Sequence, residues 1–132
     1  MNLVTAAVTR LQAEGWAEPV YAWRRWHDPQ PGSAVVVLTM ADDWSAMRTT
    51  AEAPVLRVLT TAAPHDGQDD AEAIAVEVAD RVRAVLHRPQ GGAPVWGAVR
   101  VISSMHAGSG LAEVEGHEGW FVRSLVFDVL TS

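Results

Sequence analysis

The sequence predicts an α+β fold: one domain over residues 1–132, with a mixed or antiparallel sheet of about five strands and two helices packed on one face. The length of 132 residues suits a single domain with its own core. Apolar residues recur at helical spacing in two segments, and they alternate or run together in five short ones. These segments follow one another as α-β-β-β-α-β-β, an order typical of one sheet covered by helices.

The N-terminal half contains one predicted helix and three predicted strands. Apolar residues spaced three or four apart predict a helix over residues 3–14, which Gly15 would cap in a left-handed conformation. Aromatic residues in alternation predict a strand over residues 19–26. After a proline-rich turn, a β-branched run predicts a second strand over residues 33–40. A third apolar run predicts a strand over residues 55–61.

The second helix has the clearest pattern in the sequence. Asp69, followed three residues later by Glu72, predicts a capping box at the start of a helix that runs to Arg88. An Ala/Val stripe follows one face, and Glu77 with Arg81 should form an ion pair on the other. At about 26 Å, such a helix matches a strand of about eight residues and can cover a sheet.

Two more strands are predicted near the C-terminus, at residues 96–104 and 120–130. The second is apolar on both faces, so we expect it to be central or to bury its second face against another subunit. Arg123 interrupts one of these faces and needs a partner. Residues 105–119 contain four glycines and three glutamates, and are predicted to form a long loop. A loop of this length in a small domain is usually functional or disordered.

Composition excludes several classes of chemistry. The chain has no cysteine, which removes disulfides, thiol catalysis and cysteine-based zinc sites. It has no lysine either, so it lacks Schiff-base chemistry and a P-loop lysine. A net charge of −6 without a basic run disfavours nucleic-acid binding through phosphates. No apolar run is long enough to span a membrane, and no signal peptide is apparent, so we expect a chain made and used inside a cell.

Enzymatic chemistry has weak support. Ser104 and His106 lie close in sequence, but no G-x-S-x-G elbow supports a nucleophile. His117 and Glu118, near Glu113 and Glu115, could bind a hard metal ion, although a solvated acidic loop is the simpler interpretation. His65-Asp66 is better explained by turn and capping chemistry. We therefore expect no catalytic residues, no metal site and no cofactor.

Partner binding is better supported. Trp44, Met47 and Arg48 lie together in the polar segment 41–53, and these residue types are enriched at the centres of interfaces. We expect segments 41–53 and 105–119 to be the contact loops. The candidate interface residues in the second segment are His106, Leu111, Glu113 and Glu115.

Three stretches carry a resemblance to a known family. They are Pro54-Val-Leu-Arg-Val-Leu-Thr-Thr-Ala with the loop His65-Asp-Gly-Gln, the helix from Asp69 to Arg88, and the terminal Arg123-Ser-Leu-Val-Phe-Asp-Val. In this layout the chain resembles the tail terminator (tail completion) proteins of long-tailed bacteriophages. The resemblance covers most of the chain, but it rests on the order of the elements, since the family has no catalytic motif.

The resemblance implies a structural virion protein of the tail neck, assembled in the host cytoplasm. It implies a homohexameric ring that caps the head-proximal end of the tail tube, ends tube polymerisation and meets the head–tail connector protein. DNA would pass through the lumen without specific binding, and no membrane is involved. Packed as spheres of about 36 Å, four globules leave a lumen of about 15 Å, too narrow for a duplex about 20 Å across, and six leave about 36 Å. This geometry does not distinguish five subunits from six. Three alternatives stay open. One is a head–tail connector or head completion protein. The others are a bacterial adaptor and a small α+β hydrolase or ligand-binding domain that uses Ser104, His106 and a loop carboxylate.

Overall fold

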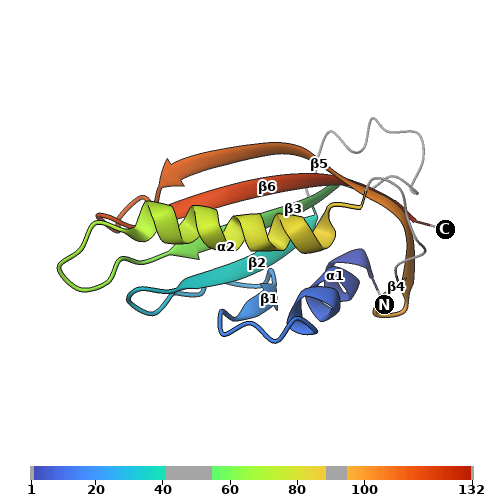
Figure 1. Cartoon of the computed structure of the whole chain (residues 1–132), viewed down its shortest axis with the longest axis horizontal. Coiled ribbons are helices and arrows are strands. Elements are labelled where there is room, and N and C mark those ends of the chain that lie inside the picture. The colour runs from blue at the N-terminus through green and yellow to red at the C-terminus, as the bar shows by residue number, and fades with distance from the viewer. Residues whose placement is uncertain (1, 41–54, 89–94, 132) are drawn as a thin grey trace.

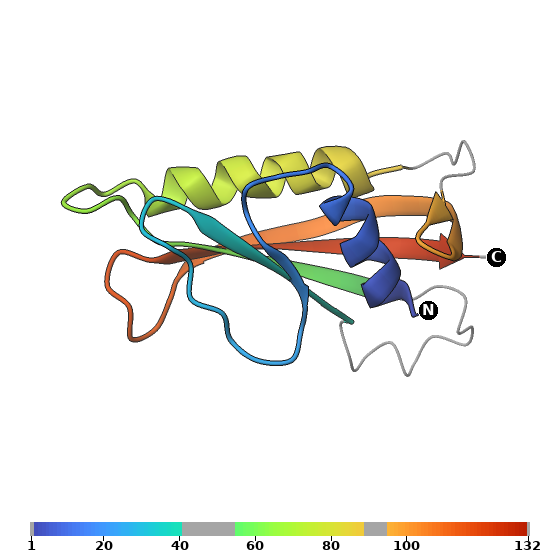
Figure 2. The same cartoon turned by 90° about the horizontal axis from the view of Figure 1, so that it is seen from below.

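A six-stranded sheet and two helices form the chain in a computed structural model, which describes residues 2–40, 55–88 and 95–131. Both helices contribute to a core on one side of the sheet, and α2 lies along it (Figures 1 and 2). The elements in chain order are α1 (Leu3–Gln12), β1 (Val20–Ala22), β2 (Ala34–Met40), β3 (Val55–Ala62), α2 (Ala71–Leu86), β4 (Val95–Trp96), β5 (Val99–Glu113) and β6 (Phe121–Thr131).

The strand order is β1-β2-β3-β6-β5-β4. β1 pairs with β2 in parallel, and all the other neighbours are antiparallel. The predicted α+β class, the mixed sheet and the helices on one face are confirmed. The additional strand is β4, whose two residues pair with the first residues of β5.

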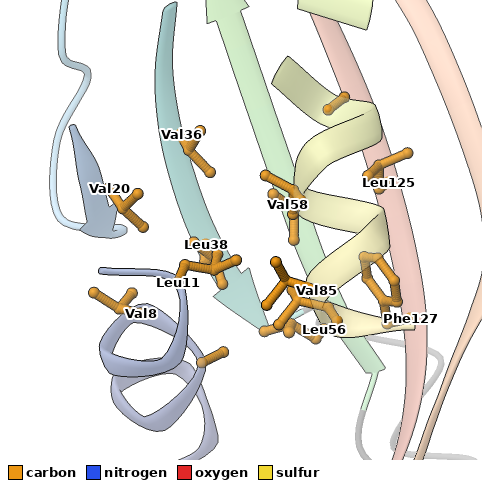
Figure 3. Packing of buried hydrophobic residues seen from close by; sticks show 14 of the residues in the cluster. Val8, Leu11, Val20, Val36, Leu38, Leu56, Val58, Val85, Leu125 and Phe127 are labelled. Carbon is orange, nitrogen blue, oxygen red and sulfur yellow. The ribbon is translucent and has the colours of Figure 1, made fainter. Parts of the chain in front are cut away.

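The core forms where the apolar stripe of α2 meets alternate residues of β3 and β6. Leu56 and Val58 of β3 and Phe127 of β6 are fully buried beneath the helix (Figure 3). Leu11 of α1 extends the same core toward β1 and β2. Burial of a side chain of this size contributes about 1.5–3 kcal/mol of stability. The amphipathic pattern of both helices is therefore what places them on the sheet.

β5 is the longest strand, and it is bent. Its register with β6 shifts between Val101 and Ser103 and again between His106 and Gly108. Such bulges increase local twist and bend a strand. The bend carries the start of β5 around the end of the core, so that β4 contacts α1 although β1 and β4 are opposite edges of the sheet (Figure 1). Trp96 of β4 is fully buried there.

The predicted loop over residues 105–119 is wrong for its first nine residues. They continue β5, and only residues 114–120 form the turn of a β-hairpin. Gly108 and Gly110 adopt no left-handed conformation and pair with Val126 and Ser124 of β6. A Cβ on Gly110 would lie 2.9 Å from the Ser124 hydroxyl oxygen. This glycine therefore allows two strands to approach, whereas the sequence pattern had indicated a loop.

The first predicted strand is shorter than expected. Only residues 20–22 pair, and residues 23–25 form a bend. Beyond the bend, the indole nitrogen of Trp26 donates to Asp28 Oδ1 at 2.8 Å, and the His27 ring stacks on Tyr21 at 4.1 Å. These local contacts satisfy the aromatic side chains within the connection to β2. The aromatic residues after residue 22 therefore belong to a folded loop. Their alternation in the sequence had predicted a strand that is too long.

The capping box predicted at Asp69 and Glu72 is also wrong. The helix begins one residue later, with Asp70 as the N-cap residue, and the Asp70 side chain makes no capping hydrogen bond. Asp70 instead accepts from the His65 backbone N–H at 2.9 Å, and its second carboxylate oxygen lies 2.5 Å from the His65 Nδ1. The Asp70 carboxylate therefore stabilises the turn before the helix, and it does not cap the first helical turn.

Candidate interaction surface

The β5–β6 hairpin has a well-held tip. The Val114 N–H donates to the Trp120 carbonyl at 2.8 Å, and the rings of His117 and Trp120 stack at 4.1 Å. The Gly119 N–H donates to Glu113 Oε1 at 3.2 Å. Backbone and side-chain contacts together hold the tip, and one of them involves the carboxylate of Glu113.

A groove of about 440 Å³ runs between this hairpin and the loop that follows β1. Val114 and Val122 give it apolar lining, and the partly exposed indole of Trp26 lines it as well. Glu113 and Glu115 add carboxylates to the same groove. An aromatic ring beside carboxylates suits an extended side chain that ends in a cation.

The hairpin end is strongly acidic. Residues 63–72 and 113–120 contain no arginine, and they carry seven carboxylates. The two segments meet, since a Cβ on Gly119 would lie 3.9 Å from the Pro64 side chain. The hydrogen bonds from His65 hold the pKa of the Asp70 carboxyl below its ordinary value. The seven residues are Asp66, Asp69, Asp70, Glu72, Glu113, Glu115 and Glu118.

The other end of α2 is basic. A groove of about 420 Å³ there is lined by Arg83, His87 and Arg88, with Asp80 and Ala84. The Arg88 guanidinium donates to the carbonyls of Ala84 and His87 at 3.0 Å each, which satisfies the end of the helix. Positive charge at a helix C-terminus is favoured by the helix dipole.

His106 connects this basic end to β5. Its backbone N–H donates to the His87 Nδ1 at 3.0 Å, and its ring lies 5.7 Å from that of Phe127. Burial lowers the pKa of His106, and the nearby charges of Arg83, His87 and Arg123 lower it further. Burial and the neighbouring positive charges therefore both disfavour the protonated form of the His106 ring.

Exposed apolar residues collect on one part of β5 and β6. Ile102, Met105 and Leu130 are between 38% and 49% exposed. Met105 lies opposite Asp128, and Leu130 lies opposite Ser103, so the two apolar side chains are close in the β5–β6 register. Met105 and Leu130 line a shallow pocket of about 230 Å³. Contiguous exposed apolar residues are a feature of protein–protein contact sites.

The structure separates the predicted interface residues. Trp44, Met47 and Arg48 lie outside the described residues. Of the others, the exposed ones are Leu111 and Glu113, near the end of β5, and Glu115 at the hairpin tip. His106 lies farther along β5, is half-buried and contacts α2. The acidic candidates therefore come together at the hairpin, and His106 belongs to the basic end.

The burial of Ser104 argues against the hydrolase alternative, in which this serine would be the nucleophile. The Ser104 side chain is fully buried, and its hydroxyl has no hydrogen-bond partner among the described residues. A substrate cannot reach it. Among all the residues that the structure describes, no group of three or more histidine or acidic side chains is arranged to hold a metal ion. Nor is any helix of residues 2–40, 55–88 and 95–131 long and apolar enough to cross a membrane.

Sequence reasoning missed three residues of this surface. Trp26 is the last residue of the strand predicted over residues 19–26, and Arg83 and His87 fall near the end of the predicted helix that runs to Arg88. The available signal was the separation of charge along the helix, with acids at its start and bases at its end. The contribution of Trp26 could not be read from spacing, because it depends on how the loop after β1 folds back.

Comparison with known proteins gives a likeness of fold. No protein-family model matches the sequence, and no curated protein matches it. Among solved structures, a chain in the "Virion of native gene transfer agent (GTA) particle" is similar, with a TM-score of 0.58 and 20% sequence identity. The match covers 97% of this chain and 94% of that chain. The two chains thus share one fold over nearly their whole lengths.

Proposed function

We propose that this chain is a structural protein of a bacteriophage-like virion and that it acts as a tail terminator. The observation that carries the proposal is the fold shared, over almost the full length of both chains, with a component of a gene transfer agent virion. In this role, copies of the chain assemble into a ring, commonly of six, at the head-proximal end of the tail tube. The ring stops tube growth and offers its other side to the head–tail connector.

The surface of the chain fits an assembly role better than catalysis. Several distinct contact regions are available: the exposed apolar patch with Met105 and Leu130, the acidic groove at the β5–β6 hairpin and the basic groove at the C-terminal end of α2. A ring subunit needs at least two regions for its neighbours and further ones for the layers above and below. Ser104, in contrast, is inaccessible to a substrate.

Binding of the purified chain to purified tail tubes tests the proposal. The tube protein is taken from the same genome, and the tagged chain is located by gold labelling in negative-stain images. A terminator labels one end of each tube and shortens the tubes as its concentration rises. A chain that labels connector rings and leaves tube length unchanged would instead be a connector or head completion protein. A chain that binds neither assembly would overturn the virion role.

A further inference from the structure

The groove at the β5–β6 hairpin and the groove at the C-terminal end of α2 differ in charge and have no lining residue in common. α2 begins on the side of the molecule where the β5–β6 hairpin lies and runs toward α1 and β4 (Figure 1). The acidic groove is formed by the hairpin and Trp26, and the basic groove is formed by the last turns of α2. The volumes of the grooves are similar, at about 440 and 420 Å³. One copy of the chain therefore carries two complementary surfaces, which cannot meet within a single molecule.

Both surfaces hold charges that the monomer leaves unpaired. Arg83 and Glu115 are exposed, and neither forms an ion pair within the described parts of the chain. Glu113, Glu115 and Trp26 line one groove, and Arg83 lines the other. A guanidinium can stack on an indole and bond a carboxylate through two N–H groups at once. The chain's cations are all arginines, which suits this geometry.

We propose that copies of this chain associate head to tail, with the Arg83 end of α2 from one copy seated in the Trp26–Glu115 groove of the next. The inference rests on the proposed ring, because it supplies the contact between neighbouring subunits. Two different surfaces on one chain make a heterologous interface, which closes into a ring when the rotation between subunits allows it. The occupant is a second copy because the complementary charges are present on the same molecule.

Charge reversal tests this contact through self-association of the purified chain, measured by sedimentation velocity over a range of concentrations. We expect wild-type association to weaken as salt is raised, because exposed charges are screened. Glu115→Arg alone and Arg83→Glu alone should each weaken association by at least about tenfold, since each replaces an attraction with a repulsion. An equimolar mixture of the two variants should associate again, because each supplies the surface that the other lacks.

Glu77→Arg is the matched control, since Glu77 is exposed on α2, is absent from both grooves and gives the same change of charge. It should leave association unchanged. Variants at Glu115 and Arg83 that associate like wild type would overturn the head-to-tail contact. If Met105→Asp then abolished association, the ring would form through the apolar patch, and the proposed function would stand. A wild-type chain that stays monomeric, both free and on tail tubes, would overturn the ring as well.

Discussion

Arg81 bonds Glu18, 63 residues away, and not its helical neighbour Glu77. Its Nη2 lies 3.0 Å from Glu18 Oε2, and its guanidinium lies 5.5 Å from the centre of the Trp16 ring. The pair predicted between Glu77 and Arg81 is therefore wrong. Position i+4 offers only a weak solvated contact, whereas the segment after α1 offers a shielded carboxylate and an aromatic face.

Removal of this link should loosen the segment between α1 and β1. We expect Arg81→Met to lower the free energy of unfolding by about 1–2 kcal/mol, since it removes a charge-assisted hydrogen bond and leaves a shielded carboxylate unpaired. Glu77→Gln, which breaks no such contact, should leave stability within about 0.5 kcal/mol. Urea denaturation of the two variants measures the difference. Equal stabilities would show that the long-range pair contributes nothing.

The same pair predicts a dependence on acid. Arg81, as hydrogen-bond donor, holds the pKa of Glu18 below its ordinary value. A carboxyl group whose pKa is lower in the folded state stabilises the fold. This stabilisation is fully present above the pKa of the unfolded chain, about 4.3, and is lost as the pH falls through the pKa of the folded state. The Glu18→Gln variant lacks this titrating carboxyl group. Its free energy of unfolding should therefore fall less steeply than that of the wild type below pH about 4.3. Denaturation midpoints across the acid range measure the two slopes.

Gly32 should resist substitution because of a close side-chain approach. Its φ is +74°, and a Cβ there would overlap the imidazole of His65, which Asp70 holds in place. Gly15 has a similar φ of +71° but open space around it. We expect Gly15→Ala to cost about 1–2 kcal/mol from backbone strain alone, and Gly32→Ala to cost about 1–3 kcal/mol more. In a His65→Ala background the excess should disappear, which thermal denaturation of the double variant would show.

His106 should make stability depend on pH near neutrality. Its pKa is lowered, mainly by burial, so the folded state binds its proton less readily than the unfolded chain does. Stability should therefore rise with pH between the lowered folded value and the unfolded value of about 6.5. His106→Gln should flatten this part of the stability curve. An NMR titration in which the His106 ring kept an ordinary pKa would contradict the expectation.

β6 offers a direct test of which face carries the core. Phe127 is fully buried beneath α2, whereas Leu130 on the same strand is 38% exposed. We expect Phe127→Ala to cost about 3–5 kcal/mol and Leu130→Ala to cost less than about 1 kcal/mol. The free energies of unfolding compare the two directly. A large loss at Leu130 would mean that the outer face is covered by another part of the protein.

Much of the fold could be predicted from the sequence. β2, β3, α2 and β6 lie within about two residues of their predicted ends, because each carries a long, regular apolar pattern that admits one interpretation. The candidate site was predicted only in part. Glu113 and Glu115 were identified as exposed acids, but they were placed on a long loop, whereas they flank a short hairpin turn.

The sequence by itself determined the class of the fold and the polarity of α2, since periodicity and charge order are properties of local segments. Only the tertiary structure decided that glycines 108 and 110 lie in a strand, that Arg81 turns to Glu18, and that Trp26 meets the hairpin. Each of these three features depends on which segment, distant in the sequence, packs next to the residue concerned. Strand pairing and ion-pair choice are set by contacts far apart in the chain, so no local pattern can specify them.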